Sequence, residues 1–224
     1  MAIQDIIDEY LLEEQNEPRT RSGLWSPSSF GRCFRNQFWN RKDEPQSNPM
    51  TGLALRQTSR GKLTHKWMQG ILLKKIPSAR AEVEVKTADI HTFIDIVTNE
   101  EAIEIKSQRG RAYEATHYKS QTPITQKHYG HFLQTVSGAI HTERDVGRLI
   151  YVNAETHQAI EYRFPITGEA VGKFEAELRE LNSYWPNELP PAKPRAFPNK
   201  QGISQDCQYC SFRDSCNRRE LGGT

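Results

Sequence analysis

The sequence predicts an α/β protein built on one central mixed sheet with helices on its flanks. Five short segments have the alternating or β-branched composition of strands: residues 81–85, 91–97, 102–106, 148–153 and 158–164. Helical periodicity precedes the first strand at 57–74, separates the third from the fourth at 122–140, and follows the last at 168–184. A chain of 224 residues is long enough for one substantial core, and we expect a single domain over residues 1–224.

Residues 1–24 are expected to form an acidic helix and a linker beside this core. The first 18 residues hold six acidic side chains and no lysine or arginine, whereas residues 19–42 hold six basic side chains and no acid. Such asymmetry favours a polyanionic partner. A solvated basic face beside an acidic helix explains it equally well, because the net charge of the whole chain is only +2.

Hydropathy argues against a membrane protein. Mean hydropathy is −0.76, and no segment approaches the roughly 18 consecutive apolar residues of a membrane span. Acidic residues interrupt each apolar run near the first residue, so this segment does not have the pattern of a signal peptide. We therefore expect a cytoplasmic protein with no membrane partner.

The expected core, residues 25–185, begins with a segment whose pattern predicts one helix. Ser26 is suited to the N-cap and Pro27 to the first helical position. Aromatic residues then recur every four positions, which predicts a buried stripe formed by Phe30, Phe34 and Phe38. Cys33 lies beside this stripe, so its sulfur is expected to face inward. Arg32 and Arg35 lie on the other side of the helix, where they are candidates for DNA contacts.

Residues 186–224 are expected to form a strap and a cysteine cluster. Five prolines between Pro186 and Pro198 indicate extended chain. Three cysteines follow with the spacing C-x2-C-x5-C, and only one cysteine lies elsewhere in the sequence; the four are Cys33, Cys207, Cys210 and Cys216. The strap would carry the C-terminal segment back across the protein to the Cys33 helix.

Three interpretations of the four cysteines remain open at this point. Structural zinc accepts four thiolates, although its sites usually contain two C-x2-4-C pairs. An iron–sulfur cluster also binds four thiolates and tolerates a distant fourth ligand. The third interpretation is four unrelated buried thiols. The spacing slightly favours the cluster over zinc.

The predicted strands carry a set of residues with metal-site chemistry. Asp95 lies inside a β-branched run, and burial of a carboxylate without a partner costs several kcal/mol, roughly. Glu104 and Lys106 share one face of the next strand. Together with His65, these carboxylates are suited to Mg²⁺ or Mn²⁺, and Lys106 to a water or phosphate. A core histidine and a surface hairpin with a weak Glu104–Lys106 pair are the structural alternatives.

Two further segments extend this candidate site. The helix expected from Thr122 to Ile140 carries Gln134 on a face of small residues, where Gly130 and Gly138 would permit close packing against a neighbour. A basic and aromatic segment before it is suited to tracking a nucleic-acid backbone, and an ordinary surface loop and helix is the equal alternative. Its candidate DNA contacts are Arg109, Arg111, Tyr113, Tyr118 and Lys119.

The order of these motifs resembles a known nuclease family. Gly61-x3-His65 is followed by Asp95, by Glu104-Ile105-Lys106 and by Gln134, as in the RecB-like branch of the PD-(D/E)XK nuclease superfamily. With Cys33 before this core and three cysteines after it, the chain is similar to the iron–sulfur members, which include the CRISPR-associated Cas-four exonucleases and the nuclease domain of AddB. The resemblance spans roughly residues 25–216, and it implies a restriction-endonuclease-like core.

The resemblance also implies residue roles. His65, Asp95, Glu104 and the main-chain carbonyl of Ile105 would bind Mg²⁺ or Mn²⁺, Lys106 would be the catalytic lysine, and Gln134 would hold substrate or the lysine. The four cysteines would ligate a structural [4Fe–4S] cluster that joins the C-terminal segment to the N-terminal helix.

The implied activity is a metal-dependent DNA nuclease, expected to act as an exonuclease on single-stranded DNA or DNA ends. The family works in CRISPR spacer acquisition, recombination and repair, or phage DNA metabolism, with protein partners in some complexes, in a prokaryotic or phage-infected cell. A catalytically silent DNA-binding or adaptor protein of the same fold is the main alternative, and a zinc-stabilised interaction module is the second.

The sequence departs from the family pattern at two places. The family often has a small residue shortly before the strand aspartate, where this chain has Phe93-Ile94. It also often has a tyrosine four residues after the glutamine, where this chain has Gly138. Tyr129 or Tyr151 are the candidates to supply that ring.

Overall fold

The computed structural model describes residues 2–17, 22–192 and 205–220, and it confirms the α/β prediction. The five strands are β1 (Arg80–Lys86), β2 (His91–Val97), β3 (Glu101–Gln108), β4 (Val146–Asn153) and β5 (Ala159–Pro165). The helices in the described ranges are α1 (Ile3–Asn16), α2 (Phe34–Lys42), α3 (Gly52–Lys75), α4 (Gly110–His117), α5 (Ile124–Lys127), α6 (Tyr129–His141), α7 (Gly168–Tyr184), α8 (Gln205–Gln208) and α9 (Arg213–Glu220).

The sheet is mixed, as predicted, and its strands follow the order of the chain, β1-β2-β3-β4-β5. Each neighbouring pair is antiparallel except β3 and β4, which run parallel over eight paired positions from Glu101↔Val146 to Gln108↔Asn153. Parallel neighbours need a long crossover. Helices α4, α5 and α6 supply it here.

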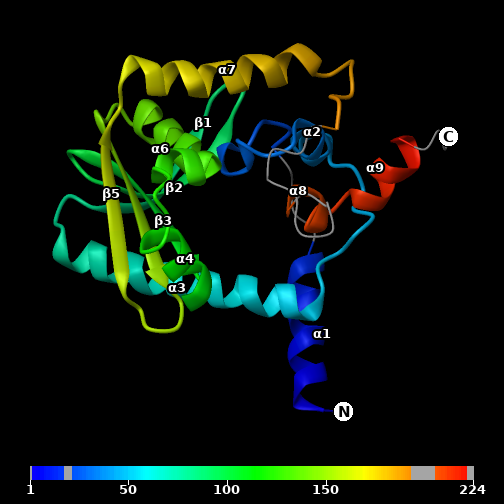
Figure 1. Cartoon of the computed structure of the whole chain (residues 1–224), viewed down its shortest axis with the longest axis horizontal. Coiled ribbons are helices and arrows are strands. Elements are labelled where there is room, and N and C mark those ends of the chain that lie inside the picture. The colour runs from blue at the N-terminus through cyan, green and yellow to red at the C-terminus, as the bar shows by residue number, and fades with distance from the viewer. Residues whose placement is uncertain (1, 18–21, 193–204, 221–224) are drawn as a thin grey trace.

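Helices cover both faces of the sheet (Figure 1). Helix α3 packs on one face, where Met68 joins Ile96, Ile103 and Ile105 in one buried cluster. Helix α6 packs on the other face, and α7 lies across α6 on its outer side (Figure 1). Strand β3 therefore lies at the centre of the sheet between the two helical layers, and its first five residues are buried.

The single helix predicted from Ser26 is wrong, because the segment is interrupted. A 3-10 turn spans Pro27–Ser29, and α2 begins only at Phe34. Gly31 between them has a φ of +76°, and a Cβ there would meet the backbone of Gly130 at 2.8 Å. The chain therefore bends at Gly31 so that it can pass close to α6. The predicted stripe of Phe30, Phe34 and Phe38 is nevertheless buried in the core.

The helix predicted from Thr122 to Ile140 also divides in two. Helices α5 and α6 meet at His128, whose φ of −118° and ψ of 57° belong to neither helix. The predicted close approach of Gly130 is confirmed, because a Cβ there would meet the carbonyl oxygen of Phe30.

Helix α1 lies at the edge of the molecule and projects away from the sheet (Figure 1). Its acidic residues pair with α3, through Asp8 with Arg56 and through Glu14 with Lys62 at 3.2 Å. The acidic helix thus packs beside a basic partner within the same chain. None of the described helices combines the length and apolar character that a bilayer span requires.

The proline-rich strap is described only in its first part. Pro190 accepts a hydrogen bond from Arg35 Nε at 2.8 Å, which places residue 190 against α2. Pro194 and Pro198 lie outside the described residues, as does the chain from 193 to 204.

Candidate metal and catalytic site

The site begins where the alternation of two strands shifts by one residue. Ile96 of β2 packs toward α3, whereas Ile94 packs toward α6, although residues two apart normally share a face. Asp95 lies between them. The register pairs Ala81 with Ile96 and Val83 with Ile94, so Glu82 of β1 lies level with Asp95, and Glu82 has a φ of +50°. Both strands therefore change face at the same level, and this brings two carboxylates together.

Asp95 then occupies a gap in the sheet. Strands β2 and β3 pair only at Ile96↔Ile103 and Val97↔Ala102, so β2 leaves β3 just before Asp95. The buried Asp95 Oδ2 accepts a hydrogen bond from Ile105 N at 2.7 Å and lies 2.7 Å from His65 Nε2 of α3. The hydrogen bond from Ile105 N to the Asp95 side chain replaces the main-chain hydrogen bond that β2 and β3 do not form at this level. It fixes the carboxylate beside the main chain of Ile105.

Lys106 and Glu104 meet on the α6 side of β3, as the two-residue spacing predicts. Lys106 Nζ lies 2.6 Å from Glu104 Oε1 and donates to Gln134 Oε1 at 2.8 Å. Glu104 and Gln134 are both buried. The ammonium group is therefore positioned from two sides, by the same strand and by α6.

The excess of carboxylates shifts the pKa of the neighbouring groups. Burial lowers the pKa of His65, but its hydrogen bond to Asp95 and the charges of Asp95, Glu104 and Glu82 outweigh this and raise the pKa above its usual value. Burial raises the pKa of Glu104 to about 8 against the lowering effect of Lys106. The acids thus favour the protonated form of His65, while burial favours the neutral form of Glu104.

Glu82 is the site residue that sequence reasoning missed. Its carboxylate and the ligand atoms of His65 and Asp95 all lie within 4.8 Å of one another, and no other such triad of His, Cys, Asp or Glu occurs among the described residues. The predicted ligand Glu104 is outside this triad. In the sequence, Glu82 is one of several acids in an alternating run, and only the register opposite Asp95 distinguishes it.

Two cavities meet at these residues. One, of about 1040 Å³, is lined by Glu82, His91 and the loop from Ser22 to Ser29; the other, of about 1240 Å³, is lined by Glu104, Lys106 and Arg109. His65, Asp95 and Gln134 line both. The shared residues are therefore reachable from two directions.

The predicted DNA contacts divide into exposed and buried residues. Tyr113 is fully buried, and Arg35 is buried where it donates to Pro190 and to Cys216 Sγ, so neither presents a surface to DNA. The others are exposed: Arg32, Arg109, Arg111, Tyr118 and Lys119. Among these, Arg109 is placed directly at the cavity that contains Lys106.

The C-terminal cysteines lie against α2 and the loop that follows it. Asn36 donates to Cys210 Sγ and Arg35 to Cys216 Sγ, each at 3.4 Å. Cys33 is the N-cap residue of α2. Burial raises the pKa of Cys207, and the charges of the other three cysteines raise it further. Residues far apart in the sequence are thus electrostatic neighbours.

Hydrogen bonds also fasten this segment to the loop after α2. Asn48 N donates to Ser211 O at 2.9 Å, and Asn48 Oδ1 accepts from Asp214 N at 2.9 Å. Trp39 of α2 and Phe212 pack with ring centroids 5.3 Å apart. The contact between the N-terminal helix and the C-terminal segment is therefore both polar and aromatic.

The second departure from the family pattern has a packing reason. A Cβ on Gly138 would already approach Ile94 Cγ2 at 3.3 Å, so the position facing β2 has no room for a tyrosine. Tyr151 pairs with Lys106 across β3 and β4, but it is fully buried and contacts His131 Nδ1 through its hydroxyl at 2.9 Å.

Comparison with known proteins gives structural neighbours only. No family model matches the chain, and no curated protein matches it significantly. The fold is similar to that of SSO0001, with 18% identity, 96% of each chain covered and a TM-score of 0.55. It is also similar to LHK-Exo, an alkaline exonuclease from Laribacter hongkongensis, with 12% identity, 78% of this chain and 91% of that one covered, and a TM-score of 0.53.

The structure of LHK-Exo in complex with dAMP matches with 13% identity, 73% of this chain and 88% of that one covered, and a TM-score of 0.52. At such identities the likeness extends to the fold. The five-stranded mixed sheet with helices on both faces is thus similar to a nuclease fold.

Proposed function

We propose that this chain is a metal-dependent DNA nuclease of the RecB-like PD-(D/E)XK type that hydrolyses phosphodiester bonds of single-stranded DNA or DNA ends. One observation carries the proposal. Asp95 Oδ2 is fixed at 2.7 Å from both His65 Nε2 and Ile105 N, while Lys106 is positioned between Glu104 and Gln134. A purely structural role for these residues would not require a buried carboxylate fixed beside a histidine and a lysine held in place from two sides.

The donor set fits Mg²⁺ or Mn²⁺. Carboxylates, an imidazole and a carbonyl are hard ligands, which these ions prefer. Adjacent ligands about 2.1 Å from an octahedral ion lie about 3.0 Å apart, and His65 Nε2 and Asp95 Oδ2 lie 2.7 Å apart. His65, Asp95, Glu104 and the carbonyl of Ile105 would hold the ion. A bound divalent ion would supply positive charge to the phosphate and to the attacking water.

The side chains around the ion have distinct tasks. Lys106 places an ammonium group where charge grows on the phosphate, and it can orient the attacking water by hydrogen bonding. The Gln134 amide oxygen accepts a hydrogen bond from that ammonium and would hold it in place from α6. Arg109, exposed at the mouth of the same cavity, is placed to contact a phosphate of the strand.

The similarity to LHK-Exo supports the choice of DNA ends as substrate. Its structures describe an alkaline exonuclease and a complex with dAMP, a product-sized nucleotide. Two cavities that meet at the catalytic side chains suit a strand that is longer than its reacting phosphate. CRISPR spacer acquisition, recombination or repair, and phage DNA processing are the settings that the family resemblance suggests.

Cleavage of labelled DNA by Lys106→Ala tests the proposal. With Mn²⁺, the wild type should degrade end-labelled single-stranded DNA, and Lys106→Ala should lose about 10³-fold in rate because an oriented cation is worth several kcal/mol in the transition state. Lys173→Ala, a change at an exposed lysine of α7, is the matched control and should cleave normally. Unchanged cleavage by Lys106→Ala would remove the enzyme assignment. DNA binding without cleavage by the wild type would favour the adaptor alternative.

We further propose that Cys33, Cys207, Cys210 and Cys216 hold a [4Fe–4S] cluster with a structural role. N–H groups that point at the sulfurs, as in Asn36 to Cys210 and Phe212 to Cys210 at 3.4 Å, are typical of such clusters. Four thiolates around one zinc ion, each about 2.3 Å from it, would lie roughly 3.8 Å apart. A [4Fe–4S] cluster would place its thiolates further apart, because each thiolate binds its own iron.

The colour of the protein separates cluster from zinc. Anaerobically purified protein should be brown, with absorption near roughly 400 nm, and Cys210→Ser should lose both the absorption and the iron. Colourless protein with one zinc ion per chain would support the zinc-stabilised module instead.

A further inference from the structure

We infer that the two cavities take different parts of one unpaired DNA strand, and that Phe93 stacks on the base of the nucleotide at the released end. The Phe93 cavity is the one that Glu82, His91 and the loop from Ser22 to Ser29 line, and Phe93 lines it too. The Lys106 cavity is the one that contains Arg109. This inference rests on the proposed function and deepens it, because it names the part of the substrate that each cavity binds.

Phe93 is an exposed aromatic residue in a strand whose other apolar residues are buried. It is 48% exposed, whereas Ile94, Ile96 and Val97 are almost completely buried. Single exposed apolar residues are common on protein surfaces, so the location of the ring carries the argument. The ring lies two residues before Asp95 and lines the same cavity as Asp95 and Gln134.

The separation of β2 from β3 opens the space beside this ring. The two strands pair only at Ile96 and Val97 of β2, so Phe93 lies on the part of β2 that has left β3. Phe93 also lines a small cavity between the strands together with Glu104 and Gln134. The ring of His91 lies next to it, with centroids 5.3 Å apart. An aromatic wall therefore borders the proposed catalytic side chains.

The Lys106 cavity has the charge that a phosphate backbone requires. Of the residues that line this cavity but not the other, four are cations and one is an acid. Lys62 and Arg213 also pair with acids outside the cavity, Glu14 and Asp214, and cations remain in excess. Cations neutralise phosphates and release their counterions, so the longer part of the strand should lie here. The charged residues of the Lys106 cavity are Lys62, Lys106, Arg109, Arg213 and Glu104.

The Phe93 cavity has the opposite balance. Glu17, Asp43 and Glu82 line it but not the Lys106 cavity, and Arg41 is the arginine among its lining residues. Arg41 is itself held between two tryptophan rings, with centroids 4.4 and 4.2 Å from its guanidinium carbon. Acids repel phosphates. Carboxylates can, however, accept hydrogen bonds from the amino groups of bases.

Hydroxyl and amide groups complete a site for a base in the Phe93 cavity. Ser22, Ser26, Ser28 and Ser29 line it, and so does Asn40. A base is uncharged, has donors and acceptors along its edges, and has a flat face that stacks on an aromatic ring. The ring of Phe93 together with these polar groups thus suits a base, whereas the cations of the Lys106 cavity suit phosphates.

This division selects an unpaired end. A base in a duplex must leave its partner and its own stack before it can reach Phe93, and that costs free energy. We assign the Phe93 cavity to the released side because the remaining strand needs the phosphate contacts to stay bound. Phe93 is therefore a substrate-binding residue that favours single-stranded DNA.

Binding of short oligonucleotides tests the inference without cleavage. All variants are made in the Lys106→Ala protein with Mn²⁺, and fluorescence anisotropy gives the dissociation constant for a labelled 15-nucleotide single strand. Phe93→Ala should weaken binding about tenfold, as the loss of one stacked base does. Phe93→Leu, which keeps an apolar side chain without a ring, should weaken it similarly, and Phe93→Trp should restore it. Tyr10→Ala, at an exposed aromatic residue of α1 outside both cavities, is the matched control and should bind normally.

A series of abasic oligonucleotides locates the stacked base. An abasic site at one of the nucleotides next to the released end should weaken binding about tenfold when Phe93 is present, and should have no further effect in Phe93→Ala. Equal sensitivity of both proteins at every position would overturn the stacking. Coupling to a base in the middle of the strand would overturn the assignment of the Phe93 cavity to the released side.

The outcomes separate this inference from the proposed function. Normal cleavage by the wild type together with unchanged binding by Phe93→Ala would overturn the role of Phe93 alone. A wild type that binds with the expected coupling but never cleaves would contradict the nuclease and leave the base site standing. Blunt duplex should bind equally to Phe93→Ala and to its parent, because no unpaired base is available. This equality, with unfolding temperatures close to that of the parent, excludes misfolding as the cause of weaker binding.

Discussion

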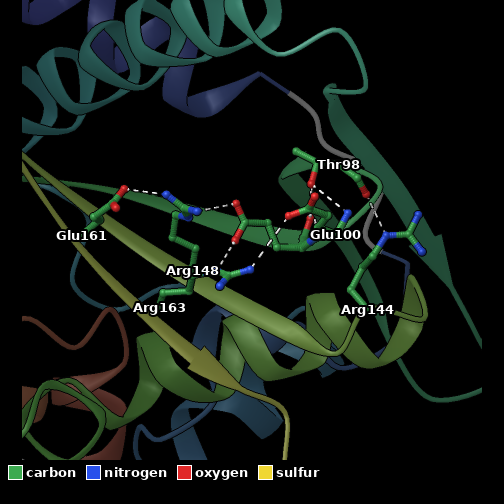
Figure 2. Close-up of polar contacts among 7 residues, drawn as sticks. Thr98, Glu100, Arg144, Arg148, Glu161 and Arg163 are labelled. Carbon is green, nitrogen blue, oxygen red and sulfur yellow. Dashed lines mark hydrogen bonds and ion pairs between the residues drawn. The ribbon is translucent and has the colours of Figure 1, made fainter.

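Two buried glutamates on β3, three residues apart, have opposite kinds of surroundings. Glu101 Oε1 accepts from Arg148 at 2.8 Å, and its Oε2 accepts from Arg163 at 3.1 Å. Arg148 also pairs with Glu161 at 2.7 Å, and these arginines converge on the start of β3 in Figure 2. Arg163 also lies 4.0 Å from Glu100, but Glu100 and Glu161 are exposed. The buried acid Glu101 therefore has one arginine at each of its oxygens, and its charge is compensated.

Glu104 is in the reverse situation. The charge of Asp95 acts on it, and Lys106 is the cation that contacts it. Two arginines that bind one oxygen each of Glu101 leave little for an added ion to do. Lys106 contacts one oxygen of Glu104, while the carboxylate of Asp95 acts on the same site, so the lysine alone does not balance the two acids. The comparison teaches that compensation of a buried acid, rather than its burial, distinguishes the structural cluster from the proposed catalytic one.

The largest expected effect is the loss of cleavage in Glu104→Gln. The change keeps the shape of the side chain but removes a metal ligand, and we expect a fall of about 10³-fold in the rate of DNA cleavage, since several kcal/mol of electrostatic stabilisation are lost. The free energy of unfolding without metal should stay equal or rise by about 1 kcal/mol, because burial disfavours the charged form of Glu104, whose pKa is raised to about 8, and glutamine carries no charge. Chemical denaturation measures it. A large loss of stability would show that Glu104 is structural after all.

Mn²⁺ should stabilise the fold by the next largest amount. An ion that binds only the native state adds about 2.7 kcal/mol at 100 times its dissociation constant. We expect this gain in wild type and in Glu101→Gln, and its loss in Asp95→Asn, because Asp95 belongs to the metal site and Glu101 does not. Thermal unfolding with and without Mn²⁺ gives the comparison. Equal stabilisation of Asp95→Asn and wild type would place the ion elsewhere.

Glu101→Gln should affect stability and spare activity. Arg148 and Arg163 would lose their shared carboxylate, and we expect the free energy of unfolding to fall by about 2 kcal/mol. The value is below that for a fully buried pair because both arginines are partly exposed and can recover water. Cleavage by the folded protein at low temperature should remain within about twofold of wild type. A fall comparable to that of Glu104→Gln would contradict the division between the two clusters.

Local rules predict the part of the site that depends on short spacing. Glu104 and Lys106 must share a face because side chains alternate along a strand. Gln134 was placed on the correct face of its helix by the pattern of small residues around it. The strands and α7 were also predicted close to their observed bounds, because alternation and helical periodicity are local patterns.

Long-range geometry explains what the sequence did not reveal. Glu82 becomes part of the site because β1 and β2 change face together, which depends on β2 leaving β3 at Asp95. No single segment contains that information. The break at Gly31 had a local signal, a glycine inside the expected helix, but its cause is the approach of Gly130 from a segment about a hundred residues away.

Two histidines repeat the contrast between the clusters on a smaller scale. His65 lies among carboxylates, and its pKa is raised. His117 lies among aromatic rings and neutral groups; its Nδ1 contacts Tyr162 Oη at 2.8 Å and its Nε2 contacts Gln108 at 2.9 Å. Burial lowers the pKa of His117 to about 4, with a smaller contribution from the charges of His128 and Lys127.

The pKa of His117 predicts an acid-dependent loss of stability. Because it is below the usual value of about 6.5 in the unfolded chain, the unfolded state binds the proton first as the pH falls. The stability contributed by neutral His117 should be complete above about pH 6.5 and should decline between there and about pH 4. His117→Gln should flatten the pH dependence of the unfolding free energy over this window, whereas His157→Gln, at an exposed position, should leave it unchanged. Parallel curves for wild type and His117→Gln would mean that the pKa of His117 is the same in the folded and the unfolded chain.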